Sequence, residues 1–255
     1  MLKPCLLWVT LVGWLEINSA HAQDVRVAVA ANFTAPVQKI AALFEQQTGN
    51  HVLLTFGGTG KFYAQIKNGA PFDILLAADD TTPLKLVHEN LAVPGSQFTY
   101  AIGKLVLWSA SVGLVDNQGK VLSSPTWQHM AVANPKLAPY GAAAMQVLDK
   151  LGLTATVQPK MASGEDIAQT YQFVASGNAQ LGFVAYSQVL KDGRLSGGSM
   201  WLVPANLYTP IRQDAALLTI AKNNLAATAL LTFLQRNAKA IEIIKSYGYD
   251  LRSGD

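Results

Sequence analysis

The sequence predicts an α/β protein of two lobes, each a mostly parallel sheet flanked by helices, with a ligand cleft between the lobes. Short β-branched runs alternate with longer stretches of helical period, which predicts parallel strands joined by right-handed crossover helices. A long extended stretch at 98–109 interrupts this alternation, which then begins again. A length of 255 residues allows one large domain or two smaller lobes. The renewed alternation of strands and helices after this stretch favours two lobes.

The composition excludes three classes of protein. Of the residues, 50% are hydrophobic and 14% are charged, with 19 Lys and Arg, 16 Asp and Glu, and 1 Cys. A disordered chain has low hydrophobicity and high net charge, and a disulfide scaffold has many cysteines. A nucleic-acid binder usually carries far more than the net charge of +3 found here.

Residues 1–22 are interpreted as a secretory signal peptide. Lys3 supplies a positive start, 5–15 is almost wholly apolar, and a small-x-small cleavage signal ends at Ala22. A membrane anchor is the alternative, but a span needs about 20 apolar residues and Glu16 interrupts this run. Export with cleavage near Ala22 predicts a periplasmic protein that has no cysteine and keeps the charge of +3.

The first lobe is expected to begin with a βαβαβ series. The expected elements are strands at 25–30, 52–56 and 72–77 and helices at 36–47 and 61–67. Gly49 and Gly69, the latter followed closely by Pro71, stop the two helices where the chain must turn back.

The second lobe repeats the alternation. The expected elements are strands at 130–133, 156–161 and 181–185, helices at 141–151 and 166–176, extended chain at 200–220, and two helices within 223–247 broken near Asn237. The last two helices should return to the first lobe, with crossings between the lobes near 100–106 and 205–212. This places the first lobe at 23–103 and 209–255, and the second at 104–208.

Four strand-to-helix turns should face the cleft, at 30–33, 57–61, 139–141 and 163–167. Ligands of α/β folds bind at the carboxyl ends of parallel strands. The side chains of these turns are small or neutral donors with few charges. Backbone N–H groups at helix N-termini bind anions without any basic side chain. The four turns together therefore suit a small anion with several oxygens.

Structural roles also explain these residues without a ligand. Asn32 and Thr59 are ordinary helix-capping residues, and Tyr140 is equally well explained as a surface aromatic. A capping box from Ser163 would place Ile167 where its N–H bonds within the helix, whereas a helix that begins later leaves that N–H available. Both interpretations of the fourth turn are open at this point.

Nucleotide binding and catalysis are disfavoured. The P-loop pattern fails because Thr55 stands at its first glycine and Phe62 at its Ser or Thr. His51, His88 and His129 are far apart without metal-ligand spacing, and no Gly-x-Ser-x-Gly nucleophile motif occurs. An exported hydrolase is the least favoured hypothesis.

Five segments as a set resemble the periplasmic molybdate-binding proteins of ABC uptake systems. They are Gly-Gly-Thr-Gly-Lys-Phe-Tyr-Ala-Gln-Ile (57–66), Asn-Gly-Ala-Pro-Phe-Asp (68–73), Phe-Thr-Tyr-Ala-Ile-Gly-Lys-Leu-Val-Leu-Trp-Ser (98–109), Asn-Pro-Lys-Leu-Ala-Pro-Tyr-Gly (134–141) and Leu-Gly-Phe-Val-Ala (181–185). The resemblance covers essentially all of 24–250. It implies a type II periplasmic-binding fold that closes on molybdate or tungstate and delivers it to an inner-membrane ABC permease. We expect a monomer without a cofactor, a catalytic residue, a protein ligand to a metal or a nucleic-acid partner.

The resemblance also implies the residues that bind the anion. Asn32 resembles the family's side-chain donor after the first strand, and Ala31 beside it offers only its backbone. Thr59 keeps one hydroxyl where many relatives show Ser-Ser-Gly, so it should donate through its side chain and its N–H. Tyr140 resembles a tyrosine that donates its phenol, and Ile167 an aliphatic residue whose N–H reaches the anion.

Residues near the expected pocket carry further expectations. Glu165 and Asp166 should point outward, because a carboxylate facing the pocket would repel an anion. Tyr186 stands one residue beyond the tyrosine position of other members, so we expect no role for it. Molybdate near neutral pH has four acceptor oxygens and no proton, so a pocket of donors disfavours protonated phosphate, while sulfate is excluded only by cavity size. The alternative is the same fold binding another oxyanion or a small organic acid.

Overall fold

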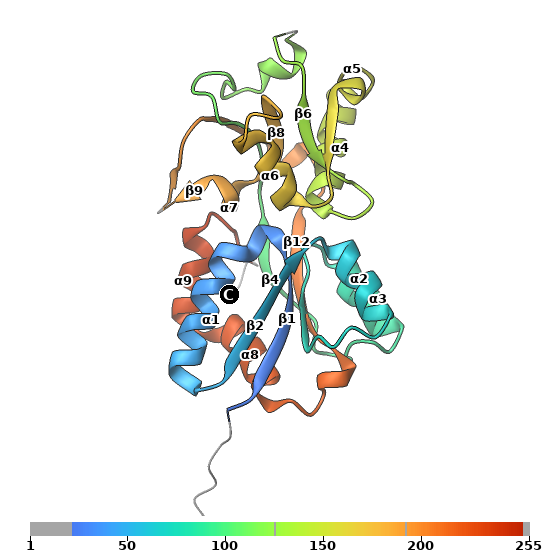
Figure 1. Ribbon diagram of the computed structural model, residues 1–255, viewed down its shortest axis with the longest axis vertical. Helices are drawn as coiled ribbons and strands as arrows, with labels where there is room; N and C mark the ends of the chain where they lie inside the picture. Colours follow the sequence, from blue (N-terminus) through green and yellow to red (C-terminus); the bar gives the residue numbers. More distant parts are fainter. Residues whose placement is uncertain (1–21, 125, 192, 252–255) are drawn as a thin grey trace, which may run out of the picture.

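Two five-stranded sheets form two lobes that are stacked end to end in the computed structural model (Figure 1). The structure describes residues 22–124, 126–191 and 193–251, so the expected signal peptide lies outside the described residues except for its last position. We call lobe I the sheet with strand order β2-β1-β3-β12-β4 and its helices, and lobe II the sheet with order β11-β5-β8-β6-β7 and its helices.

Lobe I combines the first part of the described chain with its last part. Its strands are β1 (Asp24–Ala30), β2 (His51–Gly57), β3 (Ile74–Leu76), β4 (Phe98–Gly103) and β12 (Ile211–Leu217). Its helices are α1 (Thr34–Thr48), α2 (Thr59–Lys67), α3 (Thr81–His88), α8 (Leu225–Arg236) and α9 (Ala238–Ser246), with short 3-10 turns η1 (Ala31–Phe33) and η5 (Thr219–Ala221).

Lobe II is formed by the middle of the chain. Its strands are β5 (Leu105–Ser109), β6 (Met130–Ala133), β7 (Met161–Gly164), β8 (Leu181–Ala185) and β11 (Ser199–Leu202), with a small hairpin of β9 (Leu190–Lys191) and β10 (Arg194–Leu195). Its helices are α4 (Pro139–Lys150), α5 (Thr154–Val157), α6 (Ile167–Ala175) and α7 (Tyr186–Val189), with 3-10 turns η2 (Lys120–Ser123), η3 (Gln158–Lys160) and η4 (Ala205–Leu207).

Both sheets are mixed, with a larger antiparallel share than the alternation of strands and helices predicted. In lobe I, β1 is parallel to β2 and β3, whereas β12 is antiparallel to β3 and β4. In lobe II, β6 is parallel to β7 and β8, whereas β5 is antiparallel to β8 and β11. The antiparallel pairs arise because strands on the crossing segments enter each sheet from the other lobe.

Two parts of the expected element order differ from the structure. The strand expected at 156–161 is wrong, since these residues are helical through η3 and the strand β7 begins only at Met161. A short β-branched run cannot be told from a buried helical turn by periodicity, and Pro159 lacks the N–H that a strand would use. The sequence also did not predict α3, and the stretch 98–109 is divided at Lys104 into β4 and β5, which belong to different sheets.

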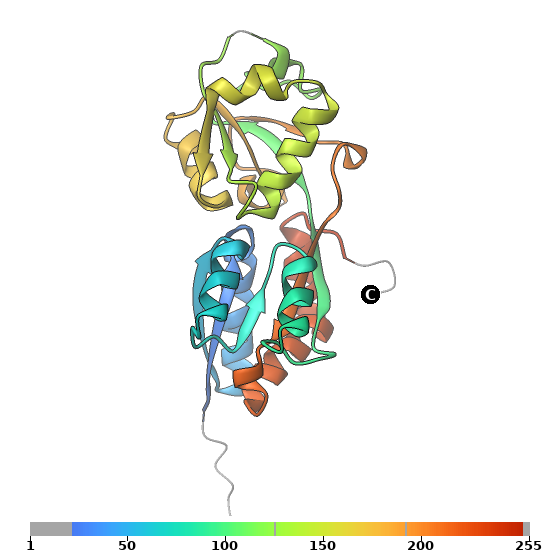
Figure 2. The ribbon, with the colours of Figure 1, turned by 90° about the vertical axis from the view of Figure 1, so that its right-hand side faces the viewer.

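The two crossings run side by side between the lobes (Figure 2). One joins β4 to β5, and the other joins β11 to β12 through 203–210. The chain then returns to lobe I, where α8 and α9 lie against α1. Asn237 separates these helices and accepts hydrogen bonds from the N–H groups of Lys239 and Ala240 at the start of α9. Within the described ranges, no helix has the length and apolar character needed to cross a membrane.

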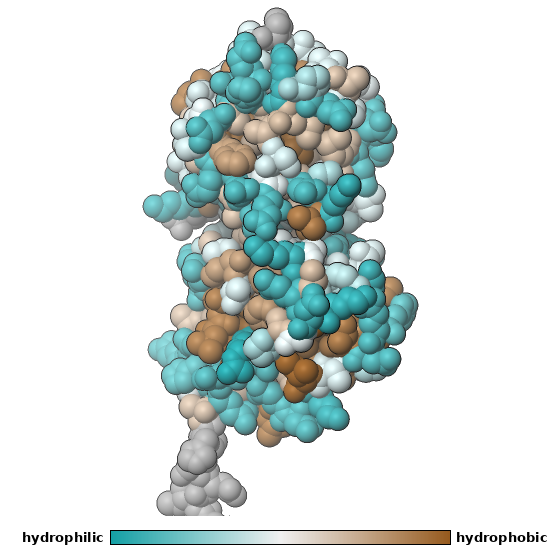
Figure 3. All heavy atoms as spheres, turned by 45° about the vertical axis from the view of Figure 1, so that its right-hand side comes forward, coloured by the Kyte–Doolittle hydropathy of each residue, from teal (hydrophilic) through white to brown (hydrophobic). Residues whose placement is uncertain are grey.

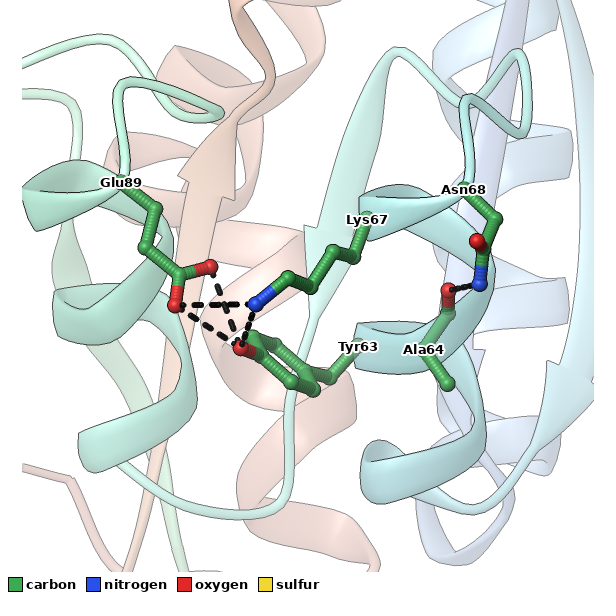
Figure 4. Close-up of polar contacts among 5 residues, drawn as sticks. All are labelled: Tyr63, Ala64, Lys67, Asn68 and Glu89. Atoms are coloured by element: carbon green, nitrogen blue, oxygen red, sulfur yellow. Dashed lines mark hydrogen bonds and ion pairs between the residues drawn. The ribbon is translucent and has the colours of Figure 1, made fainter.

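The helix α2 is held against α3 by a polar clamp (Figure 4). The Tyr63 hydroxyl lies 2.9 and 3.1 Å from the two carboxylate oxygens of Glu89. The Lys67 Nζ lies 3.4 Å from the same hydroxyl and 3.6 Å from Glu89 Oε1. The clamp links α3 to the helix α2, which carries Thr59 at its first position.

Candidate oxyanion site between the lobes

Four helix N-termini meet at the junction between the lobes, two from each lobe (Figure 1). The turn η1 follows β1 and α2 follows β2, while α4 follows β6 and α6 follows β7. Together they enclose a cavity of about 10 Å³. The residues that the sequence analysis singled out for the ligand all line this cavity: Ala31, Asn32, Thr59, Tyr140 and Ile167.

The backbone donors around the cavity are available to a ligand. The N–H groups of Asn32, Thr59, Tyr140 and Ile167 have no hydrogen-bond partner among the residues that the structure describes. Each lies in the first turn of its helix, where no intrahelical acceptor exists. The positive ends of the helix dipoles point to the same place. The cavity is therefore suited to an anion.

The start of α6 resolves the two interpretations of the fourth turn. Asp166 caps this helix, since its Oδ1 accepts hydrogen bonds from the N–H groups of Ala168 at 2.9 Å and Gln169 at 3.0 Å. The capping box from Ser163 is not formed, and the helix begins at Ile167. Ile167 therefore stands at the first helical position, outside the ladder of intrahelical hydrogen bonds.

The two carboxylates near the cavity are both engaged elsewhere. Glu165 points outward as predicted and forms an ion pair with Lys61 of lobe I at 3.0 Å. Asp166, which was also expected to point outward, instead lines the cavity, where its carboxylate accepts from the N–H groups of its own helix. The negative charge of Glu165 is thus compensated by a cation, and that of Asp166 by the N–H donors at the start of α6.

Thr59 offers two donors from a single buried residue, which is 1% exposed. Its Oγ1 accepts a hydrogen bond from the Ala78 N–H at 2.9 Å. Because the oxygen accepts in this bond, the hydroxyl hydrogen remains available to an anion, as does the backbone N–H.

The side chains of Asn32 and Tyr140 extend into a buried polar network behind the cavity. Asn32 Nδ2 donates to Gln213 Oε1 at 2.8 Å and to the Tyr249 hydroxyl at 2.9 Å. Gln213 Nε2 donates to the Tyr140 hydroxyl at 3.0 Å. Gln213 and Tyr249 were not expected from the sequence, because they lie 181 and 217 positions from Asn32 and belong to no motif.

Burial sets the protonation of the tyrosines in this network. Desolvation raises the pKa of Tyr100, Tyr140 and Tyr249 above the ordinary value of a phenol. All three hydroxyls therefore stay protonated at neutral pH, and no phenolate charge opposes an anion in the cavity.

The lobes also touch each other directly around the cavity, where the surface narrows to a waist (Figure 3). The Gly60 N–H of α2 donates to the Leu137 carbonyl of lobe II at 3.0 Å. The Ser187 hydroxyl of lobe II donates to the Asn32 carbonyl of lobe I at 2.9 Å. These contacts describe a closed arrangement of the lobes.

A larger, open cavity of about 300 Å³ adjoins the small one. The two cavities share Ala78, Ala138 and Pro139 in their linings. The larger one is lined by cationic and acidic side chains, among them Lys136, Arg212 and Asp79. Burial raises the pKa of the Asp79 carboxyl, against the opposing effect of hydrogen bonds from Thr82.

The histidines lie away from the small cavity. His51, His88 and His129 are exposed, at the start of β2, at the end of α3 and just before β6. In the described part of the chain, no three His, Cys, Asp or Glu side chains gather as a metal site. Tyr186 is the first residue of α7 and does not line the cavity.

One protein family, described as bacterial extracellular solute-binding proteins, matches residues 25–250. The chain belongs to this family. The members of the family are solute-binding proteins rather than enzymes, which agrees with a small donor-lined cavity between two lobes.

Relatives of this solute-binding protein bear more specific names. It is 59% identical over 246 residues to the molybdate-binding protein ModA of Azotobacter vinelandii, covering 96% of this chain and 97% of that protein. It is 54% identical over 230 residues to the molybdate-binding protein ModA of Rhodobacter capsulatus, covering 90% of this chain and 89% of that protein. A solved structure of a periplasmic molybdate-binding protein from Azotobacter vinelandii is similar at 44% identity with a TM-score of 0.86, covering 89% of this chain and 99% of that one.

Proposed function

We propose that this solute-binding protein captures molybdate or tungstate between its lobes and delivers it to the membrane permease of an ABC transporter. The observation that carries the proposal is the convergence of four helix N-termini, with available N–H groups, on a cavity of about 10 Å³. The ligand residues of the proposal are Ala31, Asn32, Thr59, Tyr140 and Ile167. Molybdate is the anion that relatives at 59% and 54% identity are named for.

Cavity size and donor chemistry support a small dianion. The cavity is far below the roughly 300–1,000 Å³ of pockets for drug-sized ligands. The backbone N–H groups and the Thr59 hydroxyl supply donors, and a hydrogen bond to a charged group is worth about 1.5–3 kcal/mol. A fully deprotonated tetrahedral oxyanion has only acceptors and therefore matches this set.

Titration calorimetry with molybdate, tungstate, sulfate and phosphate tests the proposal. Molybdate and tungstate should bind tightly and raise the melting temperature, since a ligand at 100 times its Kd adds about 2.7 kcal/mol of stability. For a chain of this size, that corresponds to a rise of roughly 5–11 °C. Sulfate binding of equal strength would defeat the assignment to molybdate.

A backbone variant tests the site itself. Ile167→Pro removes one N–H at the first helical position of α6, where proline is well tolerated. The affinity for molybdate should fall by roughly 10- to 150-fold, the worth of one charge-assisted hydrogen bond. Ile167→Val is the matched control, because it keeps the N–H and changes the buried side chain by one methylene. Equal affinities of the two variants would remove this N–H from the site.

A second candidate ligand is a small organic acid in the larger cavity. Its volume of about 300 Å³ and its Lys136 and Arg212 side chains favour such a ligand, while the Asp79 and Asp80 carboxylates oppose it. A calorimetric screen of small carboxylic acids distinguishes the two cavities. Binding that is lost in Arg212→Ala and kept in Ile167→Pro would support the larger one.

We further propose that the mature protein is a periplasmic monomer that begins near residue 23. The sequence pattern of 1–22 supports export, and the solved relative is described as periplasmic. The lobe boundaries of this proposal are 23–103 with 209–255, and 104–208. Mass spectrometry of the exported protein gives its first residue, and light scattering gives its mass in solution. A retained N-terminus or a dimer mass would contradict these statements.

A further inference from the structure

A buried amide pair, Asn32 and Gln213, lies directly behind the cavity. The Gln213 side chain is fully buried and bonds to three neighbours, namely the Asn32 amide at 2.8 Å, the Tyr140 hydroxyl at 3.0 Å and the Tyr100 hydroxyl at 3.1 Å. Gly103, the last residue of β4, leaves the space for this arrangement. A Cβ at Gly103 would lie 2.6 Å from Gln213 Nε2 and would also overlap the Tyr140 hydroxyl.

The amide pair leaves one polar atom without a partner. Asn32 is 3% exposed, and its Oδ1 has no hydrogen-bond partner among the described residues. Asn32 lines the cavity, whereas Gln213 and Tyr249, which take its Nδ2 hydrogens, do not. The Oδ1 is therefore the end of the amide on the cavity side. An oxygen in that position repels a dianion.

The two ends of a carboxamide have the same shape, so the hydrogen-bond network decides which way each faces. Turning only one of the two amides would place oxygen against oxygen, or N–H against N–H, across their 2.8 Å contact. Asn32 and Gln213 must therefore turn together. After a joint turn, Gln213 Nε2 donates to Asn32 Oδ1, and Asn32 Nδ2 takes the cavity side.

The tyrosine hydroxyls around the amide pair can form hydrogen bonds with it both before and after the joint turn. In the present one, the single Tyr100 hydrogen lies between two acceptors, the Ala77 carbonyl at 2.9 Å and Gln213 Oε1 at 3.1 Å. After the joint turn Tyr100 accepts from Gln213 and donates to Ala77. The Tyr249 hydrogen then lies between two Asn32 oxygens, the carbonyl at 2.8 Å and Oδ1. Ser187 Oγ, 2.9 Å from the Tyr249 hydroxyl, is a further acceptor for the Tyr249 hydrogen in both arrangements. In each arrangement at least one tyrosine hydroxyl therefore has more acceptors than its single hydrogen can serve.

We propose that Gln213 is a positioning residue that turns together with Asn32 when an oxyanion binds, so that Asn32 Nδ2 donates to the anion. This inference rests on the proposed oxyanion function and adds the residue that orients its side-chain donor. A ligand shifts such a pair by its different affinity for the two arrangements. In the anion-bound arrangement the Tyr140 hydroxyl donates to Gln213 Oε1. Tyr140 then serves the anion through its backbone N–H rather than its phenol.

Three variants and a control separate this proposal from a packing role. Asn32→Ala should weaken molybdate binding by about 10- to 150-fold, and Tyr140→Phe by less than about threefold. Gln213→Met should weaken binding by about five- to tenfold in the wild-type background, yet have no further effect in Asn32→Ala, because Gln213 acts through Asn32. Gln97→Met is the control, since Gln97 is an amide that bonds to Asp80 and Asp214 outside this network.

Failure of this inference can be distinguished from failure of the proposed function by whether the wild-type protein binds molybdate. Wild-type protein that does not bind molybdate would refute the function. If the wild-type protein binds molybdate, a large loss of affinity in Tyr140→Phe with little loss in Asn32→Ala would overturn the inference. Additive losses of affinity on changing Asn32 and Gln213 would overturn it as well. If the variants do not fold, ¹⁵N spectra of the wild-type protein decide. The side-chain amide signals of Asn32 and Gln213 should both shift on saturation with molybdate, and an unchanged Gln213 signal would overturn the proposal.

Discussion

Gly60→Ala should raise the stability of the free protein and weaken its binding of molybdate. Gly60 is the second residue of α2, where alanine is favoured over glycine by about 0.5–1 kcal/mol. In the closed arrangement its Cβ would lie 3.0 Å from the Leu137 Cα and 3.1 Å from the Leu137 carbonyl oxygen. These are backbone atoms of the other lobe, so one of the lobes must shift. Overpacking of this kind costs about 1–3 kcal/mol.

Because the cost arises only when the lobes meet, it reduces affinity rather than the stability of the free protein. The Kd for molybdate should rise by roughly 5- to 150-fold in calorimetry. The melting temperature without ligand should rise by about 1–4 °C. Gly58→Ala is the control, since its Cβ would make only ordinary contacts of 3.4 Å or more. An unchanged Kd in Gly60→Ala would show that the anion-bound form lacks this contact.

Three further predictions concern charge and helix capping. Burial raises the Asp79 pKa, so the folded protein favours the neutral carboxyl. The contribution of this neutral carboxyl to the free energy of unfolding is fully present below the pKa of Asp79 in the unfolded chain, about 3.9. It is lost as the pH rises through the higher pKa of Asp79 in the folded protein. Urea unfolding at pH 3.5 and 7 should show a larger loss of stability in wild type than in Asp79→Asn, with Asp80→Asn as control. An equal loss of stability between pH 3.5 and 7 in wild type and Asp79→Asn would contradict this prediction. Glu165→Gln removes the exposed lobe-bridging pair with Lys61 and should weaken molybdate binding by less than about fivefold. The effect should disappear in 1 M salt, and a salt-independent effect would exclude an electrostatic cause. Asn224→Ala removes the cap of α8 and should cost about 1 kcal/mol in thermal unfolding without changing the Kd, whereas a changed Kd would link α8 to the site.

Local patterning predicted the elements whose signals are local. The alternation of β-branched runs with helical stretches identified β1, β2, β6 and β8 close to their observed bounds, because apolar period and turn residues lie within each segment. The break between α8 and α9 was also predicted, since Asn237 is a strong capping residue. The strand expected at 156–161 failed because the burial of Val157 in the lobe II core, rather than its β-branched character, determines the local structure.

The turns that line the small cavity were predictable from the sequence, whereas the buried residues behind the cavity were not. Each expected ligand residue follows a strand and begins a helix, and this position is visible in the sequence. The sequence left two starts of α6 open, and the Asp166 cap decides between them. The partners of the Asn32 and Tyr140 side chains were not predictable. Gln213 comes from a crossing strand 181 positions from Asn32, and no local pattern marks such a contact.

The distribution of donors between the lobes leads to a last prediction, that molybdate holds the lobes closed. η1 and α2 belong to lobe I, whereas α4 and α6 belong to lobe II, so an anion on one open lobe meets about half of the donors. Closure adds at least the N–H groups of Tyr140 and Ile167, which at about 1.5–3 kcal/mol each give roughly 3–6 kcal/mol. Shifting a two-state equilibrium from 1:99 to 99:1 takes about 5.5 kcal/mol. An exposed ion pair such as Lys61–Glu165 contributes only about 0.2–1 kcal/mol.

The ligand rather than the direct contacts between lobes should therefore determine closure. Small-angle scattering should show a smaller radius of gyration with molybdate than without it. Ile167→Pro, which lacks one of the two lobe II donors, should require more molybdate for the same change, whereas Ile167→Val should not. A radius that is the same with and without the anion would mean that contacts such as the Gly60 N–H to Leu137 carbonyl bond already hold the free protein closed. The donors of the second lobe would then supply affinity alone.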